Sequence, residues 1–392
     1  MGSISWSLSD RDLGVLGRVG LAGIGLAFDA AERRGELDEL EPLECEYDAD
    51  GLSLEWPDDM EDEEALTPLV DYAWQTRGAE GADPDERLGA FFFPGIHSET
   101  AESDPRLRVT ENNGILATFL QHPLVQLKSK QAFEREMEVG EGNRIFVRYR
   151  EPKKKLKYPS DFDNLFYYRN LVDGEIEFSS FFFPGATRRF GDEGSWTGTA
   201  RQALPLFFAP TACYYLRLDW SEWVVVAPDI SNLELYCRFR STGPLAHMDS
   251  FAGNPADAGL KVLHRMKSWL EQSIAAETRS MEQIVGMGRR PFRCEVFQMG
   301  DVAWNRQTVR SNFVRVRPSE VALDAYDRLE EHLPNHFRPK NDGDGGFIDV
   351  PTPRAPIAQN LIDGAYWYKR LFEVPRILRD SVDRQSPQGE SL

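Results

Sequence analysis

The stretch RDLGVLGRVGLAGIGLAFDAAERR, residues 11–34, contains the longest apolar run of the chain and decides the fold. It predicts a helix from Arg11 to about Arg34 that begins after the capping residue Asp10. Glycine recurs at every third position, at Gly14, Gly17, Gly20 and Gly23. Each glycine costs about 1 kcal/mol relative to alanine in a helix, but together they expose bare backbone on one face. The spacing therefore indicates a helix that another element approaches closely, rather than a phosphate-binding glycine motif.

Strand and helix patterns extend outward from this helix in uneven clusters. Alternating apolar residues predict strands at 4–8, 145–149, 212–218, 223–226 and 235–240, a hairpin over 43–56 that turns at 48–51, and a strand pair at 294–299 and 312–317. Apolar residues at helical spacing predict helices at 61–76, 259–276, 321–333 and 357–372. This order predicts an α+β fold with mixed, mostly antiparallel sheets, packed helices and a short helical C-terminal segment.

The domain organisation follows from length and composition. The 392 residues would allow two or three domains of about 150 residues each, or one large mixed domain. We predict one large α+β body over residues 1–338, because no clear linker interrupts it. A Pro-, Gly- and Asp-rich stretch at 339–356 is predicted to be a linker, and residues 357–392 a C-terminal helix followed by a frayed tail.

The net charge of −19 is distributed unevenly along the chain. Residues 1–105 hold six basic and 27 acidic side chains, whereas residues 106–157 hold twelve basic and six acidic ones. A second basic stretch, residues 289–317, contains seven arginines. Since phosphate binding depends on the local potential and not on the total charge, the acidity of the chain does not exclude a nucleic-acid partner.

The basic stretches supply the candidate nucleic-acid-binding residues. Candidates for phosphate contacts are Lys128, Lys130, Arg148, Arg150, Lys153, Lys154, Lys155, Lys157, Arg289, Arg290, Arg306 and Arg310. Amides can hydrogen-bond base edges, so the candidates for base reading or for helix packing are Asn112, Asn113, Gln121, Asn305 and Gln307. Residues 304–317 also set Trp304 and Phe313 among arginines, which is a pattern suited to stacking on bases or equally to a core strand with a charged surface.

The sequence contains no recognisable signature of a catalytic site, a metal site or a membrane span. The chain contains no H-E-x-x-H, P-loop or G-x-S-x-G motif, so neither a catalytic residue nor a cofactor or metal is predicted. Four separated cysteines form no C-x-x-C pair, which favours a reducing, cytoplasmic compartment. The apolar run at 13–28 contains Arg18 and is shorter than the roughly 20 residues of a membrane span, so no membrane partner is expected.

Four segments, taken in order, resemble one known family. They are Gly20–Gly25 (GLAGIG), Gly114–His122 (GILATFLQH), Trp304–Gln307 (WNRQ) and Ile357–Leu361 (IAQNL) with Trp367–Tyr368. Together they are similar to the large subunit of type I CRISPR interference complexes, Cascade, in its compact branch with a Gly-Leu-Ala-Gly-Leu-Ala opening and a Thr-Phe-Leu-Gln-His box. The matching segments run from about residue 14 to 372.

The resemblance implies a non-catalytic subunit that contacts the protospacer-adjacent motif in duplex DNA and the 5' end of the guide RNA. Its expected partners are guide RNA, target duplex DNA, the backbone and 5'-handle subunits, a separate small subunit, and a helicase-nuclease or transposition factor. The chain departs from the family because it ends soon after Trp367 and because its first third is acidic. Two other interpretations stay open, namely a metal-dependent nuclease with dispersed carboxylates and an acidic interaction scaffold.

Overall fold

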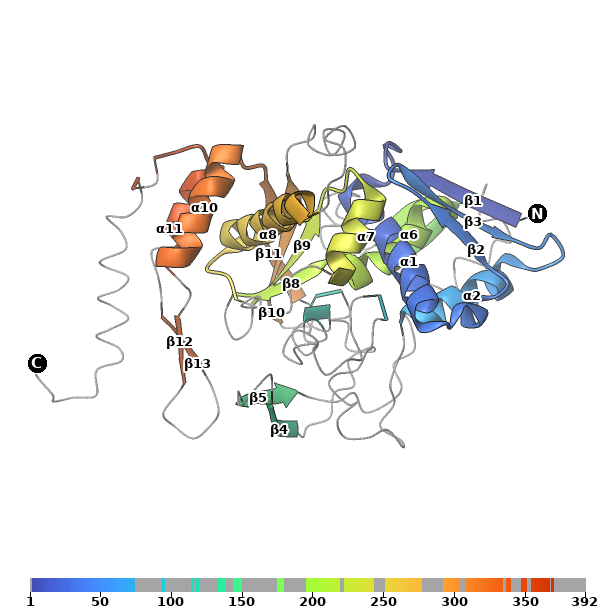
Figure 1. The fold of residues 1–392 in the computed structure, drawn as a ribbon, viewed down its shortest axis with the longest axis horizontal. Coiled ribbons are helices and arrows are strands. Elements are labelled where there is room, and N and C mark those ends of the chain that lie inside the picture. The colour runs from blue at the N-terminus through green and yellow to red at the C-terminus, as the bar shows by residue number, and fades with distance from the viewer. Residues whose placement is uncertain are drawn as a thin grey trace, which may run out of the picture.

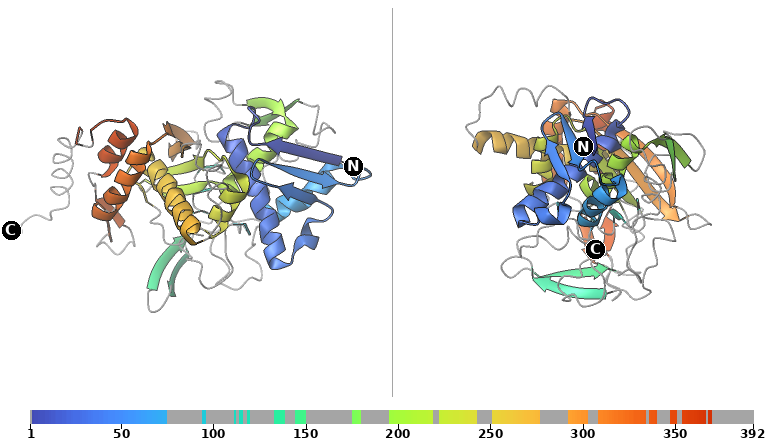
Figure 2. Two further views of the ribbon diagram at one scale, coloured as in Figure 1. Left: turned by 45° about the horizontal axis from the view of Figure 1, so that its top comes forward. Right: turned by 90° about the vertical axis from the view of Figure 1, so that its right-hand side faces the viewer.

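The computed structural model describes the chain in several separate ranges. These are residues 2–74, 94–95, 111, 114–115, 118–119, 133–138, 144–149, 175–179, 195–218, 222–242, 251–276, 292–302, 308–333, 336–339, 347–350, 354–366 and 368–369. They form an α+β fold with antiparallel strand pairing, as predicted. A three-stranded sheet lies at one end of the molecule, a four-stranded sheet lies in the middle, and the helices α10 and α11 lie at the other end (Figures 1 and 2).

The N-terminal sheet has the strand order β1-β3-β2, formed by β1 (Gly2–Ser7), β3 (Gly51–Trp56) and β2 (Glu44–Tyr47). The predicted hairpin is confirmed: Asp48 Oδ1 accepts the N–H groups of Asp50 at 2.7 Å and Gly51 at 3.0 Å, which closes the turn. A short 3-10 helix (Leu37–Leu40) connects α1 to β2, and α2 (Asp62–Ala73) follows β3.

The glycine-rich stretch forms α1 (Gly14–Arg34), the central helix of the core. It packs mainly against α6 (Ala200–Ala212), and a methyl group on Gly20 would overlap the carbonyl oxygen of Pro205. Gly23 meets the carbonyl oxygen of Phe208 in the same way, so these two glycines allow the close helix packing that was predicted. Among the described residues α1 is the one helix with the length and apolarity of a membrane span, but 78% of its most apolar window is buried by protein. This burial is that of a core helix.

Helix α6 contains two prolines, and the sequence predicted no element at this position. Its first turn is held by a capping box, in which Thr199 Oγ1 accepts the Gln202 N–H and Gln202 Oε1 accepts the Thr199 N–H. Pro205 has no N–H to donate to the carbonyl four residues earlier, that of Arg201. The Trp6 indole Nε1 donates to that carbonyl oxygen at 2.7 Å, so the proline position also joins β1 to α6.

The central sheet has the order β11-β10-β9-β8. Its strands are β8 (Tyr214–Arg217), β9 (Trp223–Pro228), β10 (Cys294–Val302) and β11 (Thr308–Val316). Helix α8 (Pro255–Ala276) covers one face, where Gly259 lies against Val296 and Val316. The predicted pairing of residues 294–299 with 312–317 is confirmed, with Cys294 opposite Val316 and a β-bulge after Gln298.

One predicted strand is wrong. Residues 235–240 belong to helix α7 (Leu233–Thr242) and not to a strand. Leu235, Cys237 and Phe239 alternate as in a strand, but Leu235 is only partly buried. The buried residues are Leu233, Tyr236, Cys237, Phe239 and Arg240, which recur at the three- and four-residue spacing of a helix. The helix begins after Asn232, whose Oδ1 accepts the N–H of Leu235 at 2.7 Å.

The C-terminal part differs from the predicted linker and helix. Strands β12 (His336–Pro339) and β13 (Phe347–Val350) pair in a hairpin, and α11 (Arg354–Ile362) follows α10 (Glu320–His332) along the chain. The range predicted as a linker, 339–356, therefore contains β13 and the first turn of α11. Helix α11 ends at Ile362, ten residues before the predicted end, and residues 363–364 form a turn in which Gly364 has a positive φ of 62°. Further hairpins are formed by β4 (Phe133–Glu138) with β5 (Arg144–Tyr149) and by β6 (Glu175–Ser179) with β7 (Ser195–Thr199).

Candidate nucleic-acid interface

Most of the residues predicted to contact nucleic acid lie outside the described residues. The backbone is described for Arg148, which is opposite Glu134 in the β4–β5 hairpin, and for Arg310, which is opposite Met299 in the central sheet. The others lie outside the described ranges: Lys128, Lys130, Arg150, Lys153, Lys154, Lys155, Lys157, Arg289, Arg290, Arg306, Asn112, Asn113, Gln121, Asn305 and Gln307. Their roles stay predictions.

The two faces of the central sheet differ in chemistry. On the face toward α8, the register aligns mostly apolar side chains, with Val296 opposite both Val314 and Val226, and it also places Gln298 opposite Asn312. On the other face, Glu295 lies opposite Arg315, and Arg217 lies opposite Trp223. Because side chains alternate between faces along each strand, these three charged residues lie on the side away from the helix. The face away from α8 is therefore the candidate interface.

The centre of this face is covered by the segment that carries the predicted Thr-Phe-Leu-Gln-His box. The Phe119 ring meets the Tyr215 ring edge-on at 6.4 Å, and Gly114 lies against the Tyr215 side chain so closely that a Cβ would not fit. Thr118 Oγ1 donates to the Gly114 carbonyl at 2.7 Å. Ile115 and Phe119 are buried, and Phe119 is the residue of the box whose packing on the sheet is described.

At one edge of the same face an arginine stacks on an aromatic ring. The Arg315 guanidinium lies 5.5 Å from the centre of the Phe313 ring, two residues earlier in edge strand β11. The Arg315 side chain is 57% exposed, and its Nε donates to Glu295 Oε1 at 3.3 Å. Arg317, two residues later, is also exposed. The end of β11 thus presents the Arg315 guanidinium over an aromatic ring, and exposed Arg317 follows directly after the strand.

The opposite edge of the sheet carries a second arginine–aromatic stack, which was not predicted from the sequence. The Arg217 guanidinium in β8 lies 5.8 Å from the Trp223 ring and 5.9 Å from the Phe251 ring. Three inter-strand steps separate β8 from β11, which is about 14 Å. Only the hairpin register, with Arg217 opposite Trp223, could have revealed this stack from sequence.

A buried ion pair anchors the start of the segment that covers the sheet. Arg240 in α7 donates to Glu111 Oε1 at 2.5 Å and to the Cys213 carbonyl at 3.0 Å. The two side chains are 1% and 3% exposed, and the guanidinium lies 4.3 Å from the centre of the Tyr214 ring. Burial acts to lower the pKa of Arg240, but Glu111 together with the neighbouring Tyr214 and Tyr236 outweighs this effect and raises the pKa above its ordinary value. Arg240 therefore stays charged and holds Glu111, the residue that precedes Asn112 and Asn113.

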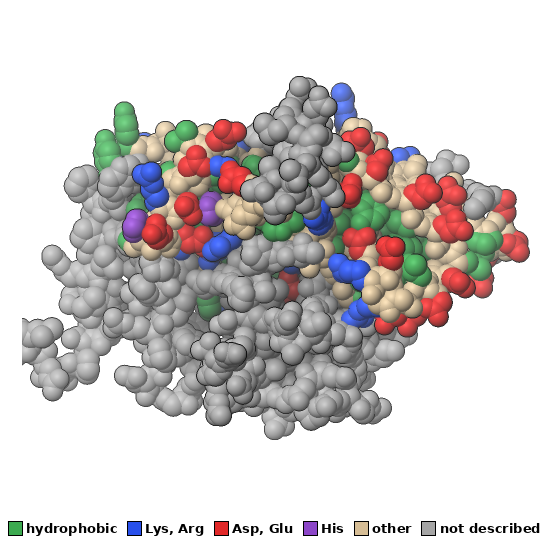
Figure 3. Space-filling view, viewed as in Figure 1, with side chains coloured by type: hydrophobic (Ala, Val, Ile, Leu, Met, Phe, Trp, Pro, Cys, Tyr) green, Lys and Arg blue, Asp and Glu red, His purple; other side chains and the backbone are tan. Residues whose placement is uncertain are grey.

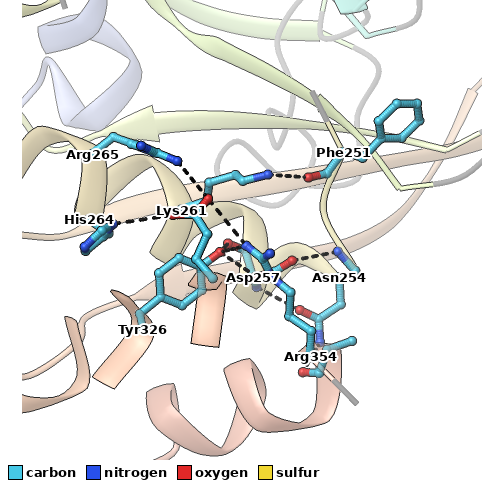
Figure 4. Close-up of polar contacts among 11 residues, drawn as sticks. Phe251, Asn254, Asp257, Lys261, His264, Arg265, Tyr326 and Arg354 are labelled. Carbon is cyan, nitrogen blue, oxygen red and sulfur yellow. Dashed lines mark hydrogen bonds and ion pairs between the residues drawn. The ribbon is translucent and has the colours of Figure 1, made fainter. Parts of the chain in front are cut away.

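A second buried network joins α8, α10 and α11 (Figure 4). Asp257 Oδ1 accepts from Arg354 Nε at 2.8 Å and from the Tyr326 hydroxyl at 2.6 Å, while its Oδ2 accepts the Gly253 N–H at 2.8 Å. Arg354 also donates to the Tyr326 oxygen. The Asp257 and Arg354 side chains are 0% and 1% exposed, so the charges are satisfied inside the protein. This network docks α11, which contains the Ile357–Leu361 segment, onto the body.

His264 lies beside this network and carries a shifted pKa. Its Nε2 is 3.4 Å from Asp327 Oδ1, and its Nδ1 is 3.7 Å from Glu330 Oε2. Burial lowers the pKa of His264 below 6.5, against the opposing effect of these two carboxylates. Within the described ranges, no group of three or more His, Cys, Asp and Glu side chains is arranged to hold a metal ion.

One comparison with known proteins assigns the chain to a family. The family model for the DevT N-terminal domain matches residues 5–207, which is about half of the chain. The chain belongs to the DevT N-terminal domain family. No match was found among the curated proteins. The part of the chain that matches the DevT N-terminal domain includes the N-terminal sheet, α1 and most of α6, and ends before the central sheet begins.

Proposed function

We propose that the chain is the non-catalytic large subunit of a type I CRISPR Cascade in the cytoplasm. It contacts the protospacer-adjacent motif in duplex DNA and the 5' end of the guide RNA, supports opening of the duplex, and recruits a separate helicase-nuclease or transposition factor. Its other partners are the backbone and 5'-handle subunits and a separate small subunit. In such complexes the guide reads the target by pairing, and protein contacts are made to the short motif and the backbone.

The arrangement of the resembling segments supports this proposal. The Gly20–Gly25 segment belongs to the core helix α1, the box around Phe119 packs on the central sheet, and Ile357–Leu361 lies in α11, docked through Arg354. Segments that are far apart in sequence therefore belong to one packed body. The family name, DevT N-terminal domain, does not state an activity.

The observation that carries the proposal is the pair of arginine–aromatic stacks on one face of the central sheet. Arg315 over Phe313 and Arg217 over Trp223 both combine a cation for phosphate with a ring that can stack on a base. The acidic side chains gather instead at the far end, over the N-terminal sheet and α2 (Figure 3). This separation of charge leaves the sheet edges accessible to a polyanion without repulsion from the acidic end.

The test begins with co-expression of the chain, its neighbouring reading frames and a CRISPR array. We expect the chain to co-purify with guide RNA and the purified complex to bind duplex DNA in a salt-dependent manner. Arg315→Ala and Arg217→Ala should each weaken binding and reduce the slope of log K against log salt by about one. Arg328→Ala is the matched control, because Arg328 is an exposed arginine on α10. Absence of bound RNA, or an unchanged salt slope in both variants, would contradict the proposal.

The same preparation distinguishes the alternatives. Cleavage of labelled DNA in Mg²⁺ or Mn²⁺ that a single carboxylate substitution abolishes would favour the dispersed-carboxylate nuclease instead. The acidic surface over the N-terminal sheet and α2 is the one observation that favours a scaffold for a basic protein (Figure 3). Capture of a basic partner in competition with DNA would support that second function.

A further inference from the structure

A partly open pocket lies between α7 and α8, on the side of the molecule where these two helices run next to each other (Figure 2). Its enclosed volume is about 60 Å³. The described residues that line it include none of those predicted from sequence to bind nucleic acid.

The walls of the pocket are apolar and aromatic. Phe239 of α7 meets Trp269 of α8 edge-on, with ring centres 5.3 Å apart, and Met266, Leu270 and Phe292 complete the lining. Trp269 and Phe292 are only partly buried, so their rings are accessible from the opening. An aromatic ring entering here would find ring surfaces and a polarisable thioether against which to stack.

The polar residues lie together at one end of the pocket. Arg293 forms an ion pair with Asp229, and Arg18 reaches the same carboxylate at 2.5 Å. Two guanidinium groups therefore share one carboxylate, which leaves one surplus positive charge beside the pocket. Ser231 is exposed, and Asn232 uses its Oδ1 to cap α7, so that its amide still carries two N–H donors.

We propose that this pocket receives an unpaired nucleobase of a single-stranded polynucleotide, whose phosphate lies against Arg293. The aromatic walls match the faces of a base, the amide and hydroxyl match its edge, and the surplus positive charge matches the phosphate. An apolar side chain of a partner protein would contact the walls but would make no use of the positive charge of Arg293 or of the amide N–H groups of Asn232, so the base fits better. The inference rests on the proposed nucleic-acid function and names the form of polynucleotide bound.

The experiment uses the full chain, or its ribonucleoprotein complex if RNA co-purifies, with fluorescein-labelled single strands of DNA and of RNA. Trp269→Ala removes a stacking surface, whereas Leu235→Trp replaces another lining residue by a larger side chain that fills the pocket. Both variants should lower the affinity about 5- to 150-fold, which is the range for one stacked base. Val321→Ala is the control, because Val321 is 77% exposed on α10, and it should bind as wild type does. Circular dichroism and thermal unfolding establish that each variant is folded.

Photo-crosslinking provides a readout that altered stability would not imitate. Strands with a single 5-iodouracil should crosslink to Trp269 or Phe292, and the RNA and DNA arms show which strand supplies the base. One outcome overturns the pocket proposal alone. In that outcome the chain binds the strands, both pocket variants bind as tightly as wild type, and the crosslinks map outside the pocket, so the proposed function stands. If a photoactivatable residue in the pocket captures a protein subunit instead, the pocket proposal is also overturned. If no single or double strand binds, both proposals fail.

Discussion

The buried pair formed by Arg240 and Glu111 gives the sharpest test of how the chain is held together. Arg240→Met removes a guanidinium that is 1% exposed and takes from Glu111 a partner 2.5 Å away. Losing one partner of such a pair costs about 3–5 kcal/mol, because a charge is left in a site of low polarity. The same substitution removes the donor to the Cys213 carbonyl, which adds about 1 kcal/mol. We therefore expect a loss of about 4–6 kcal/mol in the free energy of unfolding.

Urea unfolding followed by far-ultraviolet circular dichroism measures this loss. The double variant Arg240→Met with Glu111→Leu should be less destabilised than the sum of its two single variants, because no charge is then buried alone. Arg328→Met, at an exposed arginine on α10, should change the free energy by less than about 0.5 kcal/mol. A cost below about 1 kcal/mol for Arg240→Met, or strict additivity of the two single variants, would refute the reasoning.

Three further substitutions test separate features of the fold. Gly20→Ala should lower the free energy of unfolding by about 1–3 kcal/mol, because the added methyl group overlaps the Pro205 carbonyl. An unchanged melting temperature would contradict close packing of α1 on α6. Thr199→Ala should cost about 1 kcal/mol in urea unfolding, through loss of the capping box, and Ser3→Ala provides the surface comparison. Because burial lowers the pKa of His264, the unfolded chain binds the proton more tightly, so stability should decline as the pH falls below about 6.5. His264→Gln should remove this part of the pH dependence. If the variant and wild type show the same dependence of stability on pH, His264 is not its source.

The elements whose patterns are local were predictable from the sequence. The turn at Asp48–Gly51 closes through the side chain of Asp48, within four residues of chain, and α8 and α10 follow their apolar spacing. The same reasoning failed at residues 235–240, where a short run of residues fits both periods and burial against α1 decides for the helix. Helix α6 was not predicted, because Pro205 and Pro210 disfavour a helix in the sequence. The helix forms because tertiary partners can satisfy the carbonyl groups that the prolines leave without a donor, as the Trp6 indole does for Arg201.

The amino-acid sequence by itself determined the α+β class, the close approach of an element to the glycine face of α1, and the uneven charge along the chain. Only the tertiary structure decided which arginines form buried ion pairs inside the protein and which remain at the surface. Arg240 and Arg354 are buried against carboxylates 129 and 97 residues away, whereas Arg315 stays at the edge of a sheet. The physical reason is that the cost of burying a charge depends on partners brought together by folding, and sequence spacing does not contain that information.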